Sequence, residues 1–144
     1  HDWQGMTARR LLDWFRSSPE ITVTKMVKRE EVVRYQSEAE LLVYPCDPLY
    51  SNKTHRSLSA LEGAGAGCAL LLSGEERLYE DFEKAAGFLE DPWRHDEWVA
   101  ATIEWLANPI ELKRRQEQAR EVAAQYTWPR FDQAWAEKVE ALRV

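Results

Sequence analysis

A polar loop in the middle of the chain carries the side chains best able to do chemistry. Lys53, His55 and Arg56 place cationic or neutral hydrogen-bond donors close together, with the hydroxyl of Thr54 among them. A carboxylate, Glu62, follows shortly afterwards. Donors of this kind suit a phosphate group, whereas a carboxylate offers several acceptor sites and suits hydroxyl groups. The residue types therefore make this loop the place where function is expected.

The segments around this loop predict a strand, a loop, a helix and a second strand. Two apolar runs, Leu41–Tyr44 and Ala69–Leu72, are too short for globular helices and predict buried parallel strands. Small residues from Ser57 to about Ala66 predict a helix that packs close to a sheet. In an open parallel sheet, ligands bind outside the carboxyl ends of the strands, and anions bind at helix amino ends. The loop Asp47–Arg56 is therefore the expected site.

The remaining elements are predicted from apolar periodicity and turn residues. They are a helix over Met6–Ser17, a strand over Ile21–Lys25, a helix over Lys28–Ser37, an acidic amphipathic segment over Arg77–Ala86 and a short strand over Gly87–Leu89. The Lys28–Ser37 helix is expected to bury Val32, Val33 and Tyr35. From His95 the chain is predicted to be helical to its end, with Pro109 and Pro129 at first-turn positions.

Three apolar stripes are expected to give the helical tail its buried faces. Their members are Trp98, Ile103, Trp105 and Leu106; Ile110, Leu112, Ala119, Val122 and Ala123; and Phe131, Trp135, Val139 and Leu142. Tryptophans at these positions favour a core role over a sugar-stacking role, because the same helical faces are needed for packing.

Length and composition predict one compact domain over residues 1–144. The chain is 44% apolar and contains seven Trp, which is ample for a core. A net charge of −6 argues against wholesale nucleic-acid binding. There is no long apolar run and no signal-peptide pattern, so a cytoplasmic location is expected. Cys46 and Cys68 lack metal-ligand spacing and are expected to be buried, reduced thiols.

Alternating strands and helices, followed by a helical tail, predict an α/β fold. The expected architecture is a Rossmann-like parallel sheet with flanking helices and a helical C-terminal tail. Only three or four strands are predicted, whereas a doubly wound sheet usually has about five or six. The chain is therefore interpreted as a fragment of a longer protein that lacks the first strands of its sheet.

From Ile21 to its end, the chain resembles the carboxyl-terminal half of a GT-B glycosyltransferase of the group 1, family 4-like kind. The resemblance lies in three stretches, which are ITVTKMVKREEVVRYQSEAELLVYPCDPLY, SALEGAGAGCALLLS and GFLEDPWRHDEWVAATIEWLANPIELKRRQEQAREVAAQYTWPRF. The helix that contains Glu62 and the tail ending at Trp128 are its most specific parts. The resemblance implies half of a GT-B fold, the half that binds a nucleoside diphosphate sugar.

The resemblance also implies a role for individual residues. Glu62 matches the second glutamate of the family's E-x7-E motif, which hydrogen-bonds the ribose hydroxyls of the donor. Thr54 stands where the family has the first glutamate, so Thr54 and His55 occupy the catalytic positions of a divergent site. The other implied donor-binding residues are Lys53, Arg56, Ser57 and Leu58 at the diphosphate and Met26 and Val27 at the base.

The implied activity is transfer of a glycosyl group to an acceptor hydroxyl. No metal is expected, since no acidic pair of the DxD kind follows a strand. By family analogy, the acceptor binds the amino-terminal GT-B half, so this chain alone is expected to be inactive. The apolar face of the last helix is expected to dock that half. The basic run Lys113–Arg115 is interpreted as a solvated helix face, with weak peripheral contact to an anionic membrane as the alternative.

Other interpretations of the sequence stay open. One is a non-catalytic nucleotide-binding or protein-interaction module that keeps the fold, which Thr54 in place of an acid favours. Another is a response-regulator-like or flavodoxin-like domain, but the acidic cluster or phosphate loop that it requires is not visible in the sequence. The alternative for Glu62 is a solvated surface acid, and the alternative for Lys53–Arg56 is an exposed polar loop.

Overall fold

The computed structural model describes residues 13, 16–24, 26–45, 58–73 and 82–141. By its contacts the chain divides into two units, His1–Val32 and Val33–Val144. In the first unit, Ser17 ends a helical segment and a turn follows, in which the Ile21 N–H donates to the Ser18 carbonyl at 3.1 Å. The second unit contains the sheet. The interpretation of residues 1–144 as one domain of a longer protein stays a prediction.

Three parallel strands form the sheet, in the order β1 (Leu41–Tyr44), β2 (Ala69–Ser73) and β3 (Gly87–Leu89). Leu41 is paired with Ala69, and Ser73 with Leu89. Every residue of the central strand β2 is buried, as expected for a strand of a parallel sheet that is covered on both faces. The prediction of an α/β fold with a parallel sheet and flanking helices is confirmed.

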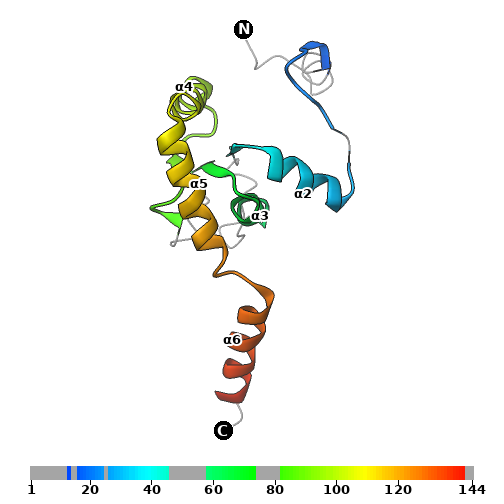
Figure 1. Cartoon of the computed structure of the whole chain (residues 1–144), viewed down its shortest axis with the longest axis vertical. Coiled ribbons are helices and arrows are strands. Elements are labelled where there is room, and N and C mark those ends of the chain that lie inside the picture. Colours follow the sequence, from blue (N-terminus) through cyan, green and yellow to red (C-terminus); the bar gives the residue numbers. More distant parts are fainter. Residues whose placement is uncertain (1–12, 14–15, 25, 46–57, 74–81, 142–144) are drawn as a thin grey trace. The chain divides into compact units, whose positions relative to one another are not determined.

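Within the described ranges the chain forms five helices of well-defined bounds (Figure 1). They are α2 (Arg29–Glu38), α3 (Leu58–Ala66), α4 (His95–Leu106), α5 (Pro109–Ala123) and α6 (Trp128–Ala141). The start of α5 follows from local chemistry, because Pro109 occupies a first-turn position and the Asn108 side chain accepts a hydrogen bond from the Glu111 N–H at 3.2 Å. These helices confirm the predicted ones to within a few residues.

One face of the sheet is covered by α3 and α5. Its core contains Ala60 and Ala64 of α3, Leu70 and Leu72 of β2, Phe82, Ala85 and Ala86 of the chain before β3, and Ala119 and Ala123 of α5. All four members contributed by the helices are alanines, so the helix axes can approach the sheet and each other closely. The large side chain in this cluster is Phe82, which stacks on Tyr126 with ring centroids 6.4 Å apart.

The other face is covered by α4 and the start of α5. Ala69 and Leu71 of β2 pack there with Trp98, Trp105 and Leu112. The Trp98 indole N–H donates to the Asp91 carbonyl at 3.0 Å, which satisfies its buried donor. The guanidinium carbon of Arg115 lies 4.1 Å from the ring centroid of Trp105. The expected core role of Trp98 and Trp105 is therefore confirmed.

The predicted strand over Ile21–Lys25 is wrong, because residues 21–24 form no strand in the structure. Alternating β-branched residues favour an extended chain, but a strand also requires a hydrogen-bonded neighbour. In the described part of this segment, the Ile21 N–H donates to the Ser18 carbonyl in a turn and not to a neighbouring strand. The predicted helix over Met6–Ser17 lies mostly outside the described residues, as do residues 77–81 of the acidic segment.

Several apolar residues that were expected to be buried are exposed. In α2, Val33 and Tyr35 are exposed, and Val32 is only partly buried. The same correction applies to Ile103 and Leu106 of α4 and to Ile110 of α5. Periodicity correctly identified which residues share a helix face, but nothing among the described residues covers these faces.

The last helix, α6, buries none of its residues. Its aromatic side chains contact one another instead. The ring of Trp128 packs edge-to-face on Phe131 with ring centroids 5.8 Å apart, and Phe131 stacks on Trp135 with centroids 6.5 Å apart. The expected core role of Trp135 is therefore wrong, because 62% of its surface is exposed. Leu142 of the same predicted stripe lies outside the described residues.

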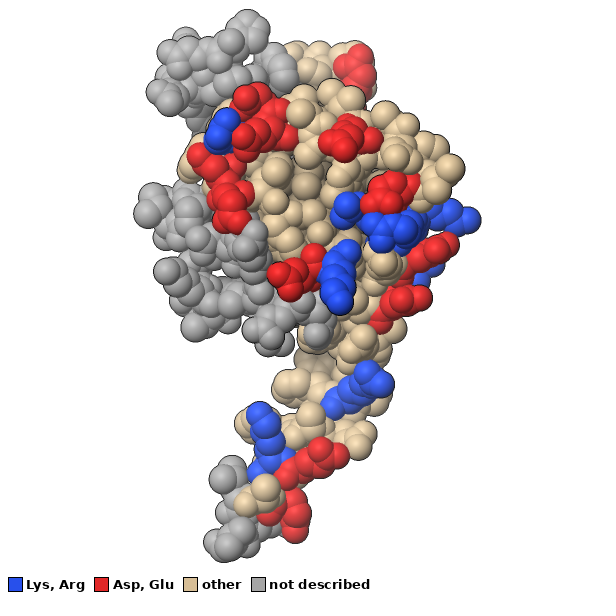
Figure 2. Space-filling model, turned by 90° about the vertical axis from the view of Figure 1, so that its left-hand side faces the viewer, with Lys and Arg blue, Asp and Glu red and all other residues tan. Residues whose placement is uncertain are grey.

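No helix among the described residues is both long and apolar enough to cross a membrane. On the face drawn in Figure 2, acidic and basic side chains lie interspersed, and the described residues there form no continuous basic field.

Candidate functional site

The amino end of α3 lies at the carboxyl edge of the sheet. This follows from topology, because α3 connects the end of β1 to the beginning of the parallel strand β2. The first turn of α3 contains no acidic residue that would offset the positive end of its dipole. Leu58, the first residue of the helix, is exposed, and Glu62 is partly buried one turn later. The predicted site residues Leu58 and Glu62 thus lie together on one helix.

Two glycines fix where α3 lies. A β-carbon at Gly63 would come within 2.8 Å of Leu42 Cδ2, so the absence of a side chain there lets the helix rest against β1. Gly67 has φ of 106°, a left-handed conformation that L side chains rarely adopt. Its N–H and that of Cys68 both donate to the Gly63 carbonyl, at 3.0 and 2.9 Å, which closes the helix. The expected close packing of helix on sheet is confirmed.

The other predicted site residues are not gathered with Leu58 and Glu62 by the described structure. Lys53, Thr54, His55, Arg56 and Ser57 lie outside the described residues. Met26 is fully exposed and Val27 is partly buried, and both belong to the unit that ends at Val32. Their assignments stay predictions.

Sequence reasoning missed one polar group at the carboxyl edge. Ser73, the last residue of β2, is completely buried, and its hydroxyl has no hydrogen-bond partner in the structure of the described residues. A buried hydroxyl without a partner costs about 1–3 kcal/mol. The available signal was a serine that ends the apolar run of Ala69–Leu72, at the edge where ligands of parallel sheets bind.

An apolar groove of about 220 Å³ lies between β1 and α4, lined by Val43, Trp98, Val99, Thr102 and Ile103. Its volume is below the range of about 300–1,000 Å³ that is usual for small-molecule sites. The Thr102 hydroxyl is the single side-chain oxygen among these five residues. The groove therefore offers no chemistry for a charged or hydroxylated ligand.

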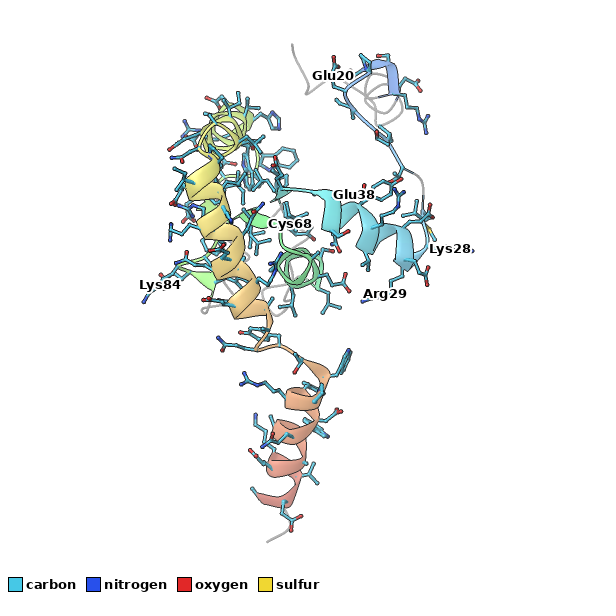
Figure 3. The ribbon with its side chains drawn as sticks, viewed as in Figure 1. Glu20, Lys28, Arg29, Glu38, Cys68 and Lys84 are labelled. Atoms are coloured by element: carbon cyan, nitrogen blue, oxygen red, sulfur yellow. The ribbon has the colours of Figure 1, made fainter. Side chains whose placement is uncertain are left out.

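The thiol of Cys68 is a structural group. It is a free, buried thiol (Figure 3), and it lies 3.1 Å from the Gln36 carbonyl and 3.6 Å from the Ala39 carbonyl. Burial raises the pKa of this thiol, which disfavours the nucleophilic thiolate. The expectation of a buried, reduced thiol is confirmed for Cys68, whereas Cys46 lies outside the described residues.

Among the described residues, the carboxylate with the clearest pKa shift is Glu111 on α5. Arg114 donates from Nε to one Glu111 carboxylate oxygen at 2.6 Å and from Nη2 to the other at 2.5 Å. This bidentate hydrogen bonding, with the charges of Arg114 and Arg115, lowers the pKa of Glu111 to about 2. The pair is exposed and is a helix i,i+3 contact, so it is a local surface feature. Among the described residues, no group of His, Cys, Asp and Glu is arranged to hold a metal ion.

Comparisons with known proteins yield no relative. No family model matches the chain, and no curated protein or solved structure matches it either.

Proposed function

We propose that this chain is the donor-binding part of a GT-B-type glycosyltransferase. The observation that carries the proposal is the β1–α3–β2 unit, which presents the acid-free amino end of α3 at the carboxyl edge of a parallel sheet. Such an edge is where α/β proteins bind nucleotides, and such a helix end binds phosphate groups. The motif resemblance from Ile21 onwards adds the class of ligand, a nucleoside diphosphate sugar.

In this proposal Glu62 accepts hydrogen bonds from the two ribose hydroxyls of the donor. Its partly buried place one turn into α3 supports this role, because a ligand seated at the helix end would reach the first turns. Lys53, Arg56, Ser57 and Leu58 would bind the diphosphate, and Met26 and Val27 would meet the base.

The proposed reaction transfers the glycosyl group to an acceptor hydroxyl as the diphosphate leaves. Thr54 and His55 would lie nearest the reacting centre, and preorganised donors would stabilise the departing diphosphate, each contributing on the order of a hundredfold in rate. No metal is required by this scheme. The acceptor would come from an amino-terminal half, and the exposed aromatic face of α6 is proposed as part of the surface that docks it.

The test is calorimetric titration of the chain with UDP, GDP and ADP, together with the Glu62→Ala variant. Loss of two hydrogen bonds to a charged acceptor should weaken binding by about 1–3 kcal/mol, which is about 5- to 150-fold in Kd. Glu104→Ala, which removes an exposed carboxylate on α4, is the matched control and should bind as wild type does. Thermal melts of each variant verify that the fold is retained.

An alternative function is a non-catalytic nucleotide-binding or protein-interaction module. The observation in its favour is Thr54, which replaces the acid of the family motif. Binding of none of the three nucleotides would overturn the donor-domain proposal and favour an interaction module. Unchanged affinity in Glu62→Ala would overturn the assignment of that residue.

A further inference from the structure

We infer that the outer edge of β1, together with the neighbouring face of α4, is a surface that binds a second copy of this chain. The two copies pair their β1 strands antiparallel across a two-fold axis. The inference goes beyond the proposed function and does not depend on it, because it uses no residue assigned to the nucleotide site.

The strand β1 lies at an edge of the sheet. The strand order is β1, β2, β3, and no strand among the described residues pairs with the outer side of β1. Unpaired backbone N–H and C=O groups on such a side are a template for another strand. Proteins commonly block an edge with charged residues or proline, whereas β1 consists of Leu-Leu-Val-Tyr. The sequence of β1 therefore leaves its edge open to pairing.

Beside this edge, α4 leaves part of the sheet uncovered. Val43 of β1 lines the apolar groove together with Val99 and Ile103 of α4. The exposed fractions of these three residues are 38%, 56% and 62%. Leu106, which is also exposed, follows Ile103 by three residues and Val99 by seven, so the three side chains form one stripe along α4. The open edge and this stripe thus make one continuous apolar surface.

The charges on α4 favour an apolar partner over a charged one. From Trp98 to Leu106 the one charged residue is Glu104. It follows Glu97 by seven residues, so the two glutamates share a helix face that is different from the face of Val99 and Ile103. An uncharged strand and an uncharged helix stripe attract a partner that buries apolar surface.

The same absence of charge suits a second copy of the chain. In a two-fold interface, the same patch is used by both partners, so a charge near the axis would meet an equal charge. The chain has a net charge of −6, and two copies therefore repel each other over much of their surfaces. The uncharged surface of β1 and α4 is a place where they can approach.

Antiparallel pairing also fits the geometry of the sheet. A two-fold axis perpendicular to the sheet puts both α4 helices on the same face, running in opposite directions, so the two grooves merge. Asp96, which lies one turn before Val99, is then at opposite ends of the helix pair in the two copies. The two three-stranded sheets become one sheet of six strands, a usual size for a doubly wound sheet. An antiparallel strand pair within an otherwise parallel sheet is common.

Sedimentation velocity over a wide range of protein concentration is the main test. Wild type should show a reversible equilibrium between monomer and dimer. Ile103→Glu should weaken dimerisation by at least about 100-fold in Kd, because the substitution occurs twice in the interface and brings like charges together. Phe131→Glu is the matched control, since it places the same charge at an exposed apolar position of α6 and should dimerise as wild type does.

Thermal melts at low protein concentration verify that both variants fold. The side chains of Ile103 and Phe131 are mostly exposed, so each variant should melt close to the wild-type temperature. Val43→Lys, which puts a charge on the edge strand itself, should weaken dimerisation as Ile103→Glu does.

Two further measurements identify the partner and the strand. An equimolar mixture of Ile103→Glu and Ile103→Lys chains should associate although each chain alone is monomeric, because opposite charges then face each other near the axis. Hydrogen exchange at the amides of Leu41–Tyr44 should become slower as the wild-type concentration rises, whereas exchange in α6 should not change.

The other outcomes overturn the inference. Wild type that is monomeric at every concentration would exclude a second copy and indicate a strand of a different polypeptide as the partner of β1. A dimer that persists in Ile103→Glu and is lost in Phe131→Glu would lie on α6. Lack of association in the mixture, or unchanged exchange in Leu41–Tyr44, would refute the two-fold strand pairing. The proposed function is tested by nucleotide binding and is unaffected by these results.

Discussion

Gly63 of α3 and Leu42 of β1 are so close that a β-carbon on the glycine would come within 2.8 Å of Leu42 Cδ2. This contact sets the distance between the helix that carries Glu62 and the strand that leads into the predicted site. A substitution that increases the distance between α3 and β1 would displace the amino end of α3 from the carboxyl edge of the sheet.

We therefore expect opposite effects from two glycine substitutions in the same helix. Gly63→Ala should lower the free energy of unfolding by about 1–3 kcal/mol through overpacking against Leu42. Gly65→Ala meets no atom within 4 Å and should raise stability by up to about 1 kcal/mol, because alanine is the better helix former. Urea denaturation followed by circular dichroism measures both, and equal effects would contradict the close contact.

Substitutions of Trp98 and Trp135 should have very different effects on the free energy of unfolding. Trp98 is buried and its indole donates to Asp91, so Trp98→Ala should cost about 3–5 kcal/mol of unfolding free energy. Trp135 lies on the exposed face of α6, and Trp135→Gln should change stability by no more than about 0.5 kcal/mol. A large loss of unfolding free energy in Trp135→Gln would show that the aromatic face of α6 packs against another part of the protein in solution.

The Glu111 carboxylate should titrate near pH 2. Because Arg114 lowers its folded-state pKa below the ordinary value, the group contributes stability above about pH 4.5, and that contribution is lost as the pH falls towards 2. Titration followed by NMR of the side-chain carboxyl should report the midpoint directly. Arg114→Gln should move the midpoint upward, whereas Arg130→Gln on α6 should not. An ordinary midpoint in the wild type would show that the bidentate contact does not persist in solution.

The Cys68 thiol should react slowly in the folded protein. Burial raises its pKa, so it contributes stability below the ordinary thiol pKa of about 9, and this contribution is lost as the pH rises above that value. In a Cys46→Ser background, alkylation by iodoacetamide at pH 8 should be far slower in buffer than in denaturing urea. Similar rates in both conditions would show that the thiol is accessible.

The sheet could be predicted from the sequence because the patterns that indicate its strands and connecting helix are local. The runs of Leu41–Tyr44 and Ala69–Leu72 and the small residues of α3 match the observed parallel crossover closely. The Ile21–Lys25 prediction failed because pairing depends on a neighbouring strand, which no local pattern specifies. Ile103 and Ile110 fit their helical stripes, yet they are exposed, because periodicity does not show whether a face has a partner.

For the candidate site, too, some residues could be predicted from the sequence and one could not. Leu58 and Glu62 could be placed from sequence because the end of an apolar run and a small-residue helix together fix the edge where α3 begins. Ser73 could not be identified as special, since a serine after Leu72 resembles an ordinary strand end. Its significance arises only from burial without a hydrogen-bond partner, which is a property of the packed sheet.

The parallel strand order also has a consequence for how the chain folds. β1 cannot pair with β2 until α3 has reversed the chain direction, and β3 can join only after β2 is in place, so no strand pair forms from sequence neighbours alone. Such a topology makes folding slow relative to a helical bundle of the same length. The packing of α3 on β2 joins residues that are close in sequence, so substitutions in that contact should slow refolding more than they speed unfolding.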